Sequence, residues 1–252
     1  MMKWKTKKNY WQQDIRTFEY VKAVLQGSFI IGVVSYFFYG SFLGAFLLSP
    51  YLIRYINSWK KQAIQKKKQE FKVQFKEGML SMSAALNVGY SAENAIREAW
   101  KDLQLLYKTD AIIVREFQYM VRQLDMHLSV ERILQEFANR TCDEEVQLFA
   151  TVFSMAKKSG GDMIEIIQNA VSQIGEKIDV KREIHMIMAA KRLEFRIMCA
   201  IPFAMIAYLK ISFPSFMEVL YGNALGIGVM SICLLVYVLA FELGKRIIEI
   251  EV

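Results

Sequence analysis

An apolar run near the N-terminus places the strongest constraint on how this chain can fold. Residues 24–56 contain no charged side chain before Arg54. A single helix of that length would measure about 50 Å, whereas the hydrocarbon core of a bilayer is about 30 Å thick. A turn at residues 39–41 would divide the run into two short spans. The sequence therefore predicts a transmembrane hairpin over residues 23–56, and a re-entrant hairpin is the alternative because each arm is short.

Basic residues are concentrated beside the apolar runs of the chain. They include Lys3, Lys5, Lys7, Lys8, Arg16, Lys22, Lys60, Lys61, Lys66, Lys67, Lys68, Lys181, Arg182, Lys191, Arg192 and Arg196. Because lysine and arginine favour the cytoplasmic flanks of membrane spans, two crossings keep both ends of the first run inside. This placement favours a membrane surface over nucleic acid as the reason for a net charge of +7, and we expect no nucleic-acid partner.

The N-terminal segment 1–22 is predicted to be a basic cytoplasmic stretch of the mature protein. Its basic lead is too long for a secretory signal, and no small-residue cleavage site follows the apolar segment.

A second apolar region, residues 197–241, predicts another hairpin of two spans. Pro202 is expected to kink the first of these spans, and Lys210 lies close to its outer end. Pro214 marks the break between the spans, in an outer loop predicted at about 212–223. The tail 242–252 carries two basic residues, which indicates a cytoplasmic end. Four spans with both termini cytoplasmic, in contact with membrane lipids, are the consistent solution.

The region between the two hairpins, residues 57–196, is predicted to be a cytoplasmic domain of about six antiparallel helices. Apolar residues recur at spacings of three and four in most of its segments, which is typical of amphipathic helices. Gly89 is expected to end the first helix in a left-handed conformation, and Ser91 is expected to cap the second. The fold class expected for the whole chain is an all-α membrane protein, in which this helical bundle lies between two transmembrane hairpins.

Two adjacent glycines, Gly160 and Gly161, separate two strongly helical segments of this domain. A phosphate-binding loop would follow a strand and would carry a lysine and a hydroxyl at set spacing. The segment here follows a helix, and Asp162 stands three residues before Glu165 in capping-box form. We therefore expect a turn between helices, followed by one long helix that starts near 163 and continues into the third span. Thr141 and Glu144 have the same spacing and predict a second capping box.

The sequence contains no arrangement that we interpret as catalytic, cofactor-binding or metal-binding. His127 and His185 are the only histidines and stand far apart in the sequence. The three cysteines are expected to be small apolar residues rather than disulfide partners. Carboxylates such as Glu144 and Glu145 are expected on solvent-exposed helix faces. The protein is therefore predicted to be non-enzymatic and to work by binding and by transmitting motion.

Three segments resemble a known family in their order along the chain. The stretch MLSMSAALNVGYSAENAIREA resembles the first signature of the type II secretion system F-domain family, and GGDMIEIIQNA resembles its second. The stretch ISFPSFMEVLYGNALGIGVM resembles the outer loop and last span of the B-type branch of tight-adherence pilus proteins. Together these segments and the region between them cover residues 70–252.

The resemblance implies an inner-membrane platform protein of a type II secretion or type IV pilus machine. Such a protein would bind a cytoplasmic secretion ATPase and would take part in the extraction and assembly of prepilin or pilin. The family's usual member has two F-domains in tandem, whereas one is found here, so a sister subunit or a second copy is implied as a partner. A transporter or channel-like subunit with a cytoplasmic helical domain is the alternative, and it predicts buried charges within the spans.

Overall fold

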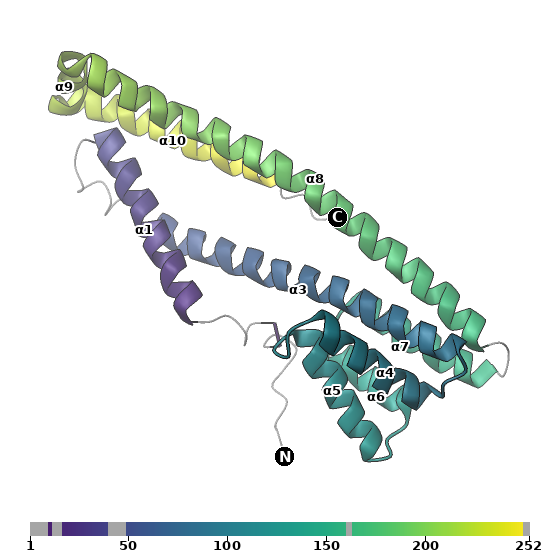
Figure 1. The fold of residues 1–252 in the computed structure, drawn as a ribbon. Helices are drawn as coiled ribbons and strands as arrows, with labels where there is room; N and C mark the ends of the chain where they lie inside the picture. The colour runs from purple at the N-terminus through teal and green to yellow at the C-terminus, as the bar shows by residue number, and fades with distance from the viewer. Residues whose placement is uncertain (1–9, 12–16, 40–48, 160–162, 249–252) are drawn as a thin grey trace. The chain divides into compact units, whose positions relative to one another are not determined.

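The computed structural model is all-helical over the residues that it describes, which are 10–11, 17–39, 49–159 and 163–248. The all-α prediction is therefore confirmed. The helices are α1 (Thr17–Tyr39), α3 (Ser49–Asn87), α4 (Ala92–Leu106), α5 (Ile112–Asp125), α6 (Val130–Thr141), α7 (Glu144–Ser159), α8 (Met163–Ser212), α9 (Pro214–Gly222) and α10 (Ala224–Ile248) (Figure 1).

Three helices among the described residues are long and apolar enough to cross a membrane. The spans lie at Tyr20–Phe38 in α1, within Met163–Ser212 in α8, and at Leu225–Ile248 in α10. The hairpin predicted over residues 23–56 has a second arm after the turn at 39–41. Residues 40–48 lie outside the described part of the chain, and the remainder of this arm is the beginning of α3.

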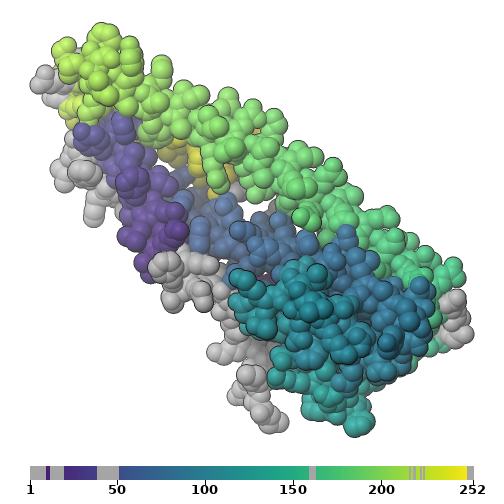
Figure 2. Space-filling view, viewed as in Figure 1, coloured from purple at the N-terminus to yellow at the C-terminus, as the bar shows by residue number. Residues whose placement is uncertain are grey.

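The chain divides into two units, which are described separately. The first unit is formed by residues 1–14 and 64–182, and the second by residues 15–63 and 183–252. Helices α3 and α8 belong to both units, because each continues without a break across the unit boundary. Figure 2 shows the surface of α8 as an unbroken green band. The predicted domain boundary at 56/57 therefore falls inside a helix.

One apolar core holds the first unit together, and six helical segments contribute to it. The largest fully buried side chains of this core are Phe71, Phe75, Met79, Met82, Ile96, Leu103, Ile113, Met120, Ile133, Phe137, Phe153 and Ile167. They recur every three or four residues in α3 and α6 and lie seven residues apart in α4 and α5, so each of these helices turns one apolar face inward. The rings of Phe71 and Phe75 lie 6.1 Å apart and each lies close to the ring of Phe137.

The turn between α3 and α4 has the geometry that its sequence predicts. Gly89 has a φ of 97°, and the N–H of Tyr90 donates to the carbonyl of Ala85, so the last carbonyls of α3 gain partners. The hydroxyl oxygen of Ser91 accepts a hydrogen bond from the N–H of Asn94 at 3.3 Å and caps α4. A residue with a Cβ would be strained at Gly89.

Helix α3 passes close to α5 at Gly78, and this contact leads to a prediction about stability. A Cβ at Gly78 would lie 2.9 Å from Cζ of the buried Phe117, whereas a Cβ at Gly175 of α8 would lie 3.6 Å from the flexible Lys76. We expect Gly78→Ala to destabilise the first unit by about 1–3 kcal/mol, because the core must shift. The matched Gly175→Ala should stabilise it by up to about 1 kcal/mol. Thermal unfolding followed by circular dichroism would compare the two; equal effects would contradict the close packing.

The second unit contains α1, α9, α10, the beginning of α3 and most of α8. Tyr55 of α3 packs against Gly27 of α1. Arg54 of α3 makes two hydrogen bonds to the carboxylate of Glu242 in α10, at 2.8 and 2.7 Å. The rings of Phe195 in α8 and Phe241 in α10 stack at 5.6 Å. Polar and aromatic contacts therefore join four helices near one end of the candidate spans.

Two predicted features, the outer loop and the start of one helix, differ from the structure. The outer loop at 212–223 is largely the short helix α9, and Pro214 is its first residue, where a missing N–H costs nothing. Pro202 lies inside α8, which continues through it. The predicted capping box at Thr141 is wrong, because Thr141 ends α6 and its hydroxyl donates to the carbonyl of Phe137.

Candidate functional site

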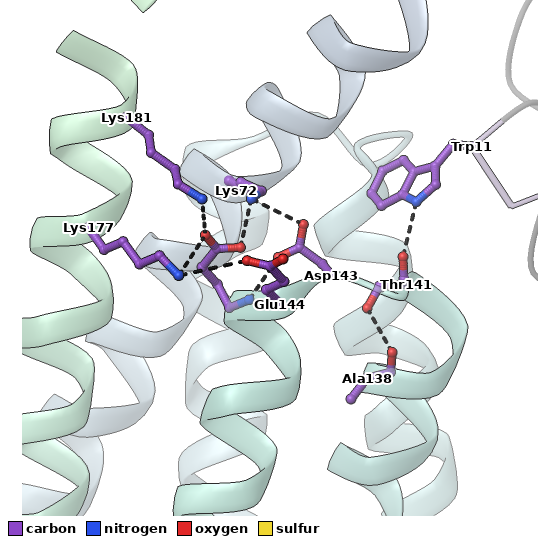
Figure 3. Close-up of polar contacts among 9 residues, drawn as sticks. Trp11, Lys72, Ala138, Thr141, Asp143, Glu144, Lys177 and Lys181 are labelled. Carbon is purple, nitrogen blue, oxygen red and sulfur yellow. Dashed lines mark hydrogen bonds and ion pairs between the residues drawn. The ribbon is translucent and has the colours of Figure 1, made fainter. Parts of the chain in front are cut away.

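A cluster of charged side chains lies where α3, α7 and α8 meet in the first unit. We call it the lysine clamp; it consists of Asp143 and Glu145 at the start of α7, Lys72 of α3, and Lys177 and Lys181 of α8 (Figure 3). The side chain of Glu145 is 0% exposed and that of Asp143 is 6% exposed.

The carboxylate of Glu145 accepts hydrogen bonds from lysine amines of both long helices, α3 and α8. Lys72 Nζ lies 2.6 Å from Glu145 Oε2, and Lys181 Nζ lies 3.1 Å from Glu145 Oε1. Lys177 Nζ lies 3.8 Å from the same Oε1 atom. A buried carboxylate needs such partners, because an unpaired charge in the interior is costly. One side chain of α7 therefore ties α3 to α8.

Asp143 begins α7 and also faces Lys72. Its Oδ1 atom accepts a hydrogen bond from the N–H of Glu145 at 3.2 Å, as an N-cap residue does, and its Oδ2 atom lies 3.5 Å from Lys72 Nζ. This N-cap stands two residues after the Thr141 predicted for that role.

The pKa values of the two carboxyl groups of the clamp are shifted in opposite directions. Burial, together with a hydrogen bond to Glu145, raises the pKa of Asp143 to about 6, although the charge of Lys72 opposes this. Burial alone would also raise the pKa of Glu145. Hydrogen bonds from Asp143, Lys72 and Lys181 outweigh it and hold the pKa of Glu145 well below its usual range. Glu145 therefore stays ionised, whereas Asp143 becomes protonated as the pH falls below about 6.

The amine of Lys72 remains charged in the clamp. Burial by itself lowers the pKa of Lys72, but the hydrogen bond to Glu145 and the negative charges of both carboxylates raise it above the ordinary lysine value. The clamp therefore pairs the cations Lys72 and Lys181 with the anion Glu145, and these ion pairs connect α3 and α8 to α7.

The pKa of Asp143 leads to a prediction about pH. A carboxyl group whose pKa is raised by folding destabilises the folded state as it ionises, so this contribution worsens as pH rises from about 4 through 6. Asp143→Asn keeps the N-cap and cannot ionise. We expect Asp143→Asn to stabilise the first unit at pH 8 by about 1–3 kcal/mol, and to have little effect near pH 4.5. Thermal midpoints of both proteins from pH 4.5 to 8 would test this; parallel pH profiles would contradict it.

An N-terminal anchor lies close to the clamp in the same unit (Figure 3). The indole of Trp11 is 7% exposed, packs edge-on against Phe71 at 5.2 Å and donates to the carbonyl of Thr141 at 3.0 Å. The hydroxyl of Tyr10 donates to Glu116 at 2.8 Å, and Glu116 also accepts from Arg140 at 2.6 Å. Tyr10 and Trp11 are therefore fixed to the core of the first unit.

The residues singled out in the sequence are spread over the structure rather than gathered at one site. Gly89 and Ser91 form the α3–α4 turn, and Glu165 lies in the first turn of α8. Gly160, Gly161 and Asp162 lie outside the described residues. His127 follows α5 with a φ of 59°, and His185 lies within α8.

Sequence reasoning missed the clamp, and the expectation that Glu145 lies on a solvent-exposed face is wrong, because its side chain is buried. Glu144, the preceding residue, is 81% exposed as expected. Over the described residues, no group of three or more His, Cys, Asp or Glu side chains could hold a metal ion.

Comparison of the sequence with protein-family models and with curated proteins gave no match, and comparison with solved structures gave none either.

Proposed function

We propose that this chain is a non-enzymatic platform protein of the inner membrane, in a type II secretion or type IV (tight-adherence) pilus machine. It would couple a cytoplasmic secretion ATPase to the extraction and assembly of pilin subunits. In this proposal the first unit is the cytoplasmic antiparallel bundle, and the apolar segments form the transmembrane hairpins. The three family-like segments of the sequence support this assignment.

The observation that carries the proposal is the continuity of α3 and α8. These helices have 39 and 50 residues, and each runs from the core of the first unit into the second unit, which contains the candidate membrane spans of α1, α8 and α10. At 1.5 Å per residue, α8 is about 75 Å long. A helix transmits displacement along its axis better than a flexible linker does, because each residue is hydrogen-bonded to the next turn.

The lysine clamp supports the same interpretation. Lys72 of α3 and Lys181 of α8 both bind the carboxylate of Glu145. A partner that pushes on the first unit would therefore act on both helices together, and through them on the spans.

An insertion that interrupts α8 at the unit boundary tests the proposal. We expect Gly-Gly-Ser-Gly inserted after Glu183 to abolish surface filaments and secreted pilin in cells that lack the original gene, while both units stay folded. The same four residues inserted after Lys108, in the turn between α4 and α5, form the matched control and should leave assembly near the normal level.

Two results would count against the proposal. Normal filament assembly with the α8 insertion would show that helix continuity is not used. Normal assembly after deletion of every secretion ATPase gene of the host would remove the motor from the scheme. Membrane insertion and thermal unfolding of each variant would be measured in parallel, so that loss of the protein is not read as loss of coupling.

A further inference from the structure

Six exposed basic side chains surround one end of the second unit. We call them the basic collar; its members are Lys22 of α1, Lys60 and Lys61 of α3, Arg192 and Arg196 of α8, and Arg246 of α10. Contacts between the four helices show that these side chains lie at a similar position along the candidate spans.

Contacts between neighbouring residues place the collar at the edge of the candidate spans. Lys60 Nζ lies 4.8 Å from the ring of Tyr20, the first residue of the span in α1. Two residues earlier in α3, Ser58 accepts a hydrogen bond from Lys245, near the end of the span in α10. The start of one span, the end of another and the lysines of α3 are therefore at one depth.

Helix α8 joins the same level through an aromatic contact. Phe195, between the two arginines of the collar in α8, stacks on Phe241 of α10 at 5.6 Å. The next residue of α10, Glu242, is held by Arg54 of α3. Four helices thus present cations at a single boundary between apolar and polar sequence.

No ion pair joins a collar cation to a carboxylate among the described residues, although the charge of Arg246 acts on Glu242 four residues earlier. Two acidic side chains of the same helices are paired with cations outside the collar, Glu242 with Arg54 and Glu194 with Lys191 at 2.9 Å. Aromatic side chains lie at the same level, namely Tyr20, Trp59, Phe195 and Phe241. Aromatic rings beside exposed cations are typical of the headgroup region of a bilayer.

We propose that the basic collar binds the phosphate groups of anionic phospholipids in the leaflet where α1 begins and α10 ends. The charge and the position of the collar favour this ligand over an acidic protein, because the cations lie near the ends of candidate membrane spans. Juxtamembrane cations attract anionic lipids, and the attraction is screened by salt. This proposal depends on the candidate spans and is independent of the platform function.

The test uses the full chain reconstituted in vesicles of three parts phosphatidylcholine and one part phosphatidylglycerol. Electron paramagnetic resonance of spin-labelled lipids would give the relative association of each lipid with the protein. We expect a preference of about threefold to tenfold for phosphatidylglycerol at low salt, falling towards one at 0.5 M salt.

Matched variants separate the collar from net charge. K60Q/K61Q/R192Q/R196Q should lose most of the preference. K101Q/K108Q/R132Q/K158Q removes the same charge from exposed positions of the first unit and should retain it. K60R/K61R/R192K/R196K keeps the charge and should also retain the preference, which guards against a folding defect in the first variant.

Three outcomes would overturn the proposal. The original protein could show no lipid preference, the glutamine collar variant could keep it, or the control variant could lose it equally. Displacement of phosphatidylglycerol by 10 mM inorganic phosphate would identify the collar as a site for free phosphate. Capture of an acidic protein in neutral detergent, with no preference in vesicles, would assign it to a protein partner.

Discussion

Replacement of Glu145 with alanine is expected to destabilise the first unit by about 3–5 kcal/mol, the range for removing one partner of a buried ion pair. The side chain is 0% exposed, and its loss removes the acceptor that lies 2.6 Å from Lys72 Nζ and 3.1 Å from Lys181 Nζ. Lys72 would keep only Asp143, at 3.5 Å. Thermal and urea unfolding of the full chain in detergent, followed by circular dichroism, would measure the effect.

The adjacent Glu144 supplies an unusually close control for this experiment. Its carboxylate is 81% exposed and lies 3.9 Å from Lys177, so Glu144→Ala should change stability by less than about 0.5 kcal/mol. The two variants differ in one position along the same helical turn and remove the same charge. Equal midpoints for Glu144→Ala and Glu145→Ala would show that the clamp contributes nothing to stability.

Replacing both Glu145 and Lys72 with apolar residues tests whether the loss of stability comes from unpaired charge or from lost packing. If the cost of Glu145→Ala comes from stranded amines, Glu145→Met combined with Lys72→Met should recover part of it, since a well-packed apolar pair can replace a buried ion pair. A double variant that is no more stable than Glu145→Met alone would point to packing rather than charge.

The apolar pattern of α7 contained a signal for the burial of Glu145. The residues at 149 and 153 are buried phenylalanines, and Glu145 stands one further turn towards the N-terminus on the same face. A carboxylate in line with an apolar stripe indicates a buried, partnered charge. Its partners could not be read from the sequence, because Lys72 and Lys181 come from helices 73 and 36 residues away.

Much of the helical fold of the first unit was predictable, because its apolar residues recur at helical spacing. The apolar spacing of the sequence predicts helices over 111–124, 130–139 and 143–158, and these correspond to α5, α6 and α7 within two residues. The long helix from 163 into the apolar segment is also found, as α8. The capping box predicted at the α6–α7 junction is misplaced, because Thr141 and Asp143 both suit the N-cap position and Asp143 occupies it.

The anchoring of the N-terminal segment was not predictable at all. Tyr10 and Trp11 stand in a basic stretch that carries no helical pattern, and their partners Glu116 and Thr141 are 106 and 130 residues away. Such contacts depend on the assembled core.

Trp11→Ala is expected to cost the first unit about 3–5 kcal/mol, because a buried indole leaves a large cavity beside Phe71 and the carbonyl of Thr141 loses its donor. Trp11→Phe keeps most of the packing and should cost about 1–2 kcal/mol, chiefly for the hydrogen bond. Trp59→Phe, in the second unit, controls for aromatic loss elsewhere and should leave the unfolding of the first unit unchanged. Circular dichroism suits this comparison better than tryptophan fluorescence, which the substitutions themselves alter. If Trp11→Ala unfolds at the same midpoint as Trp11→Phe, the packing of the indole does not stabilise the first unit.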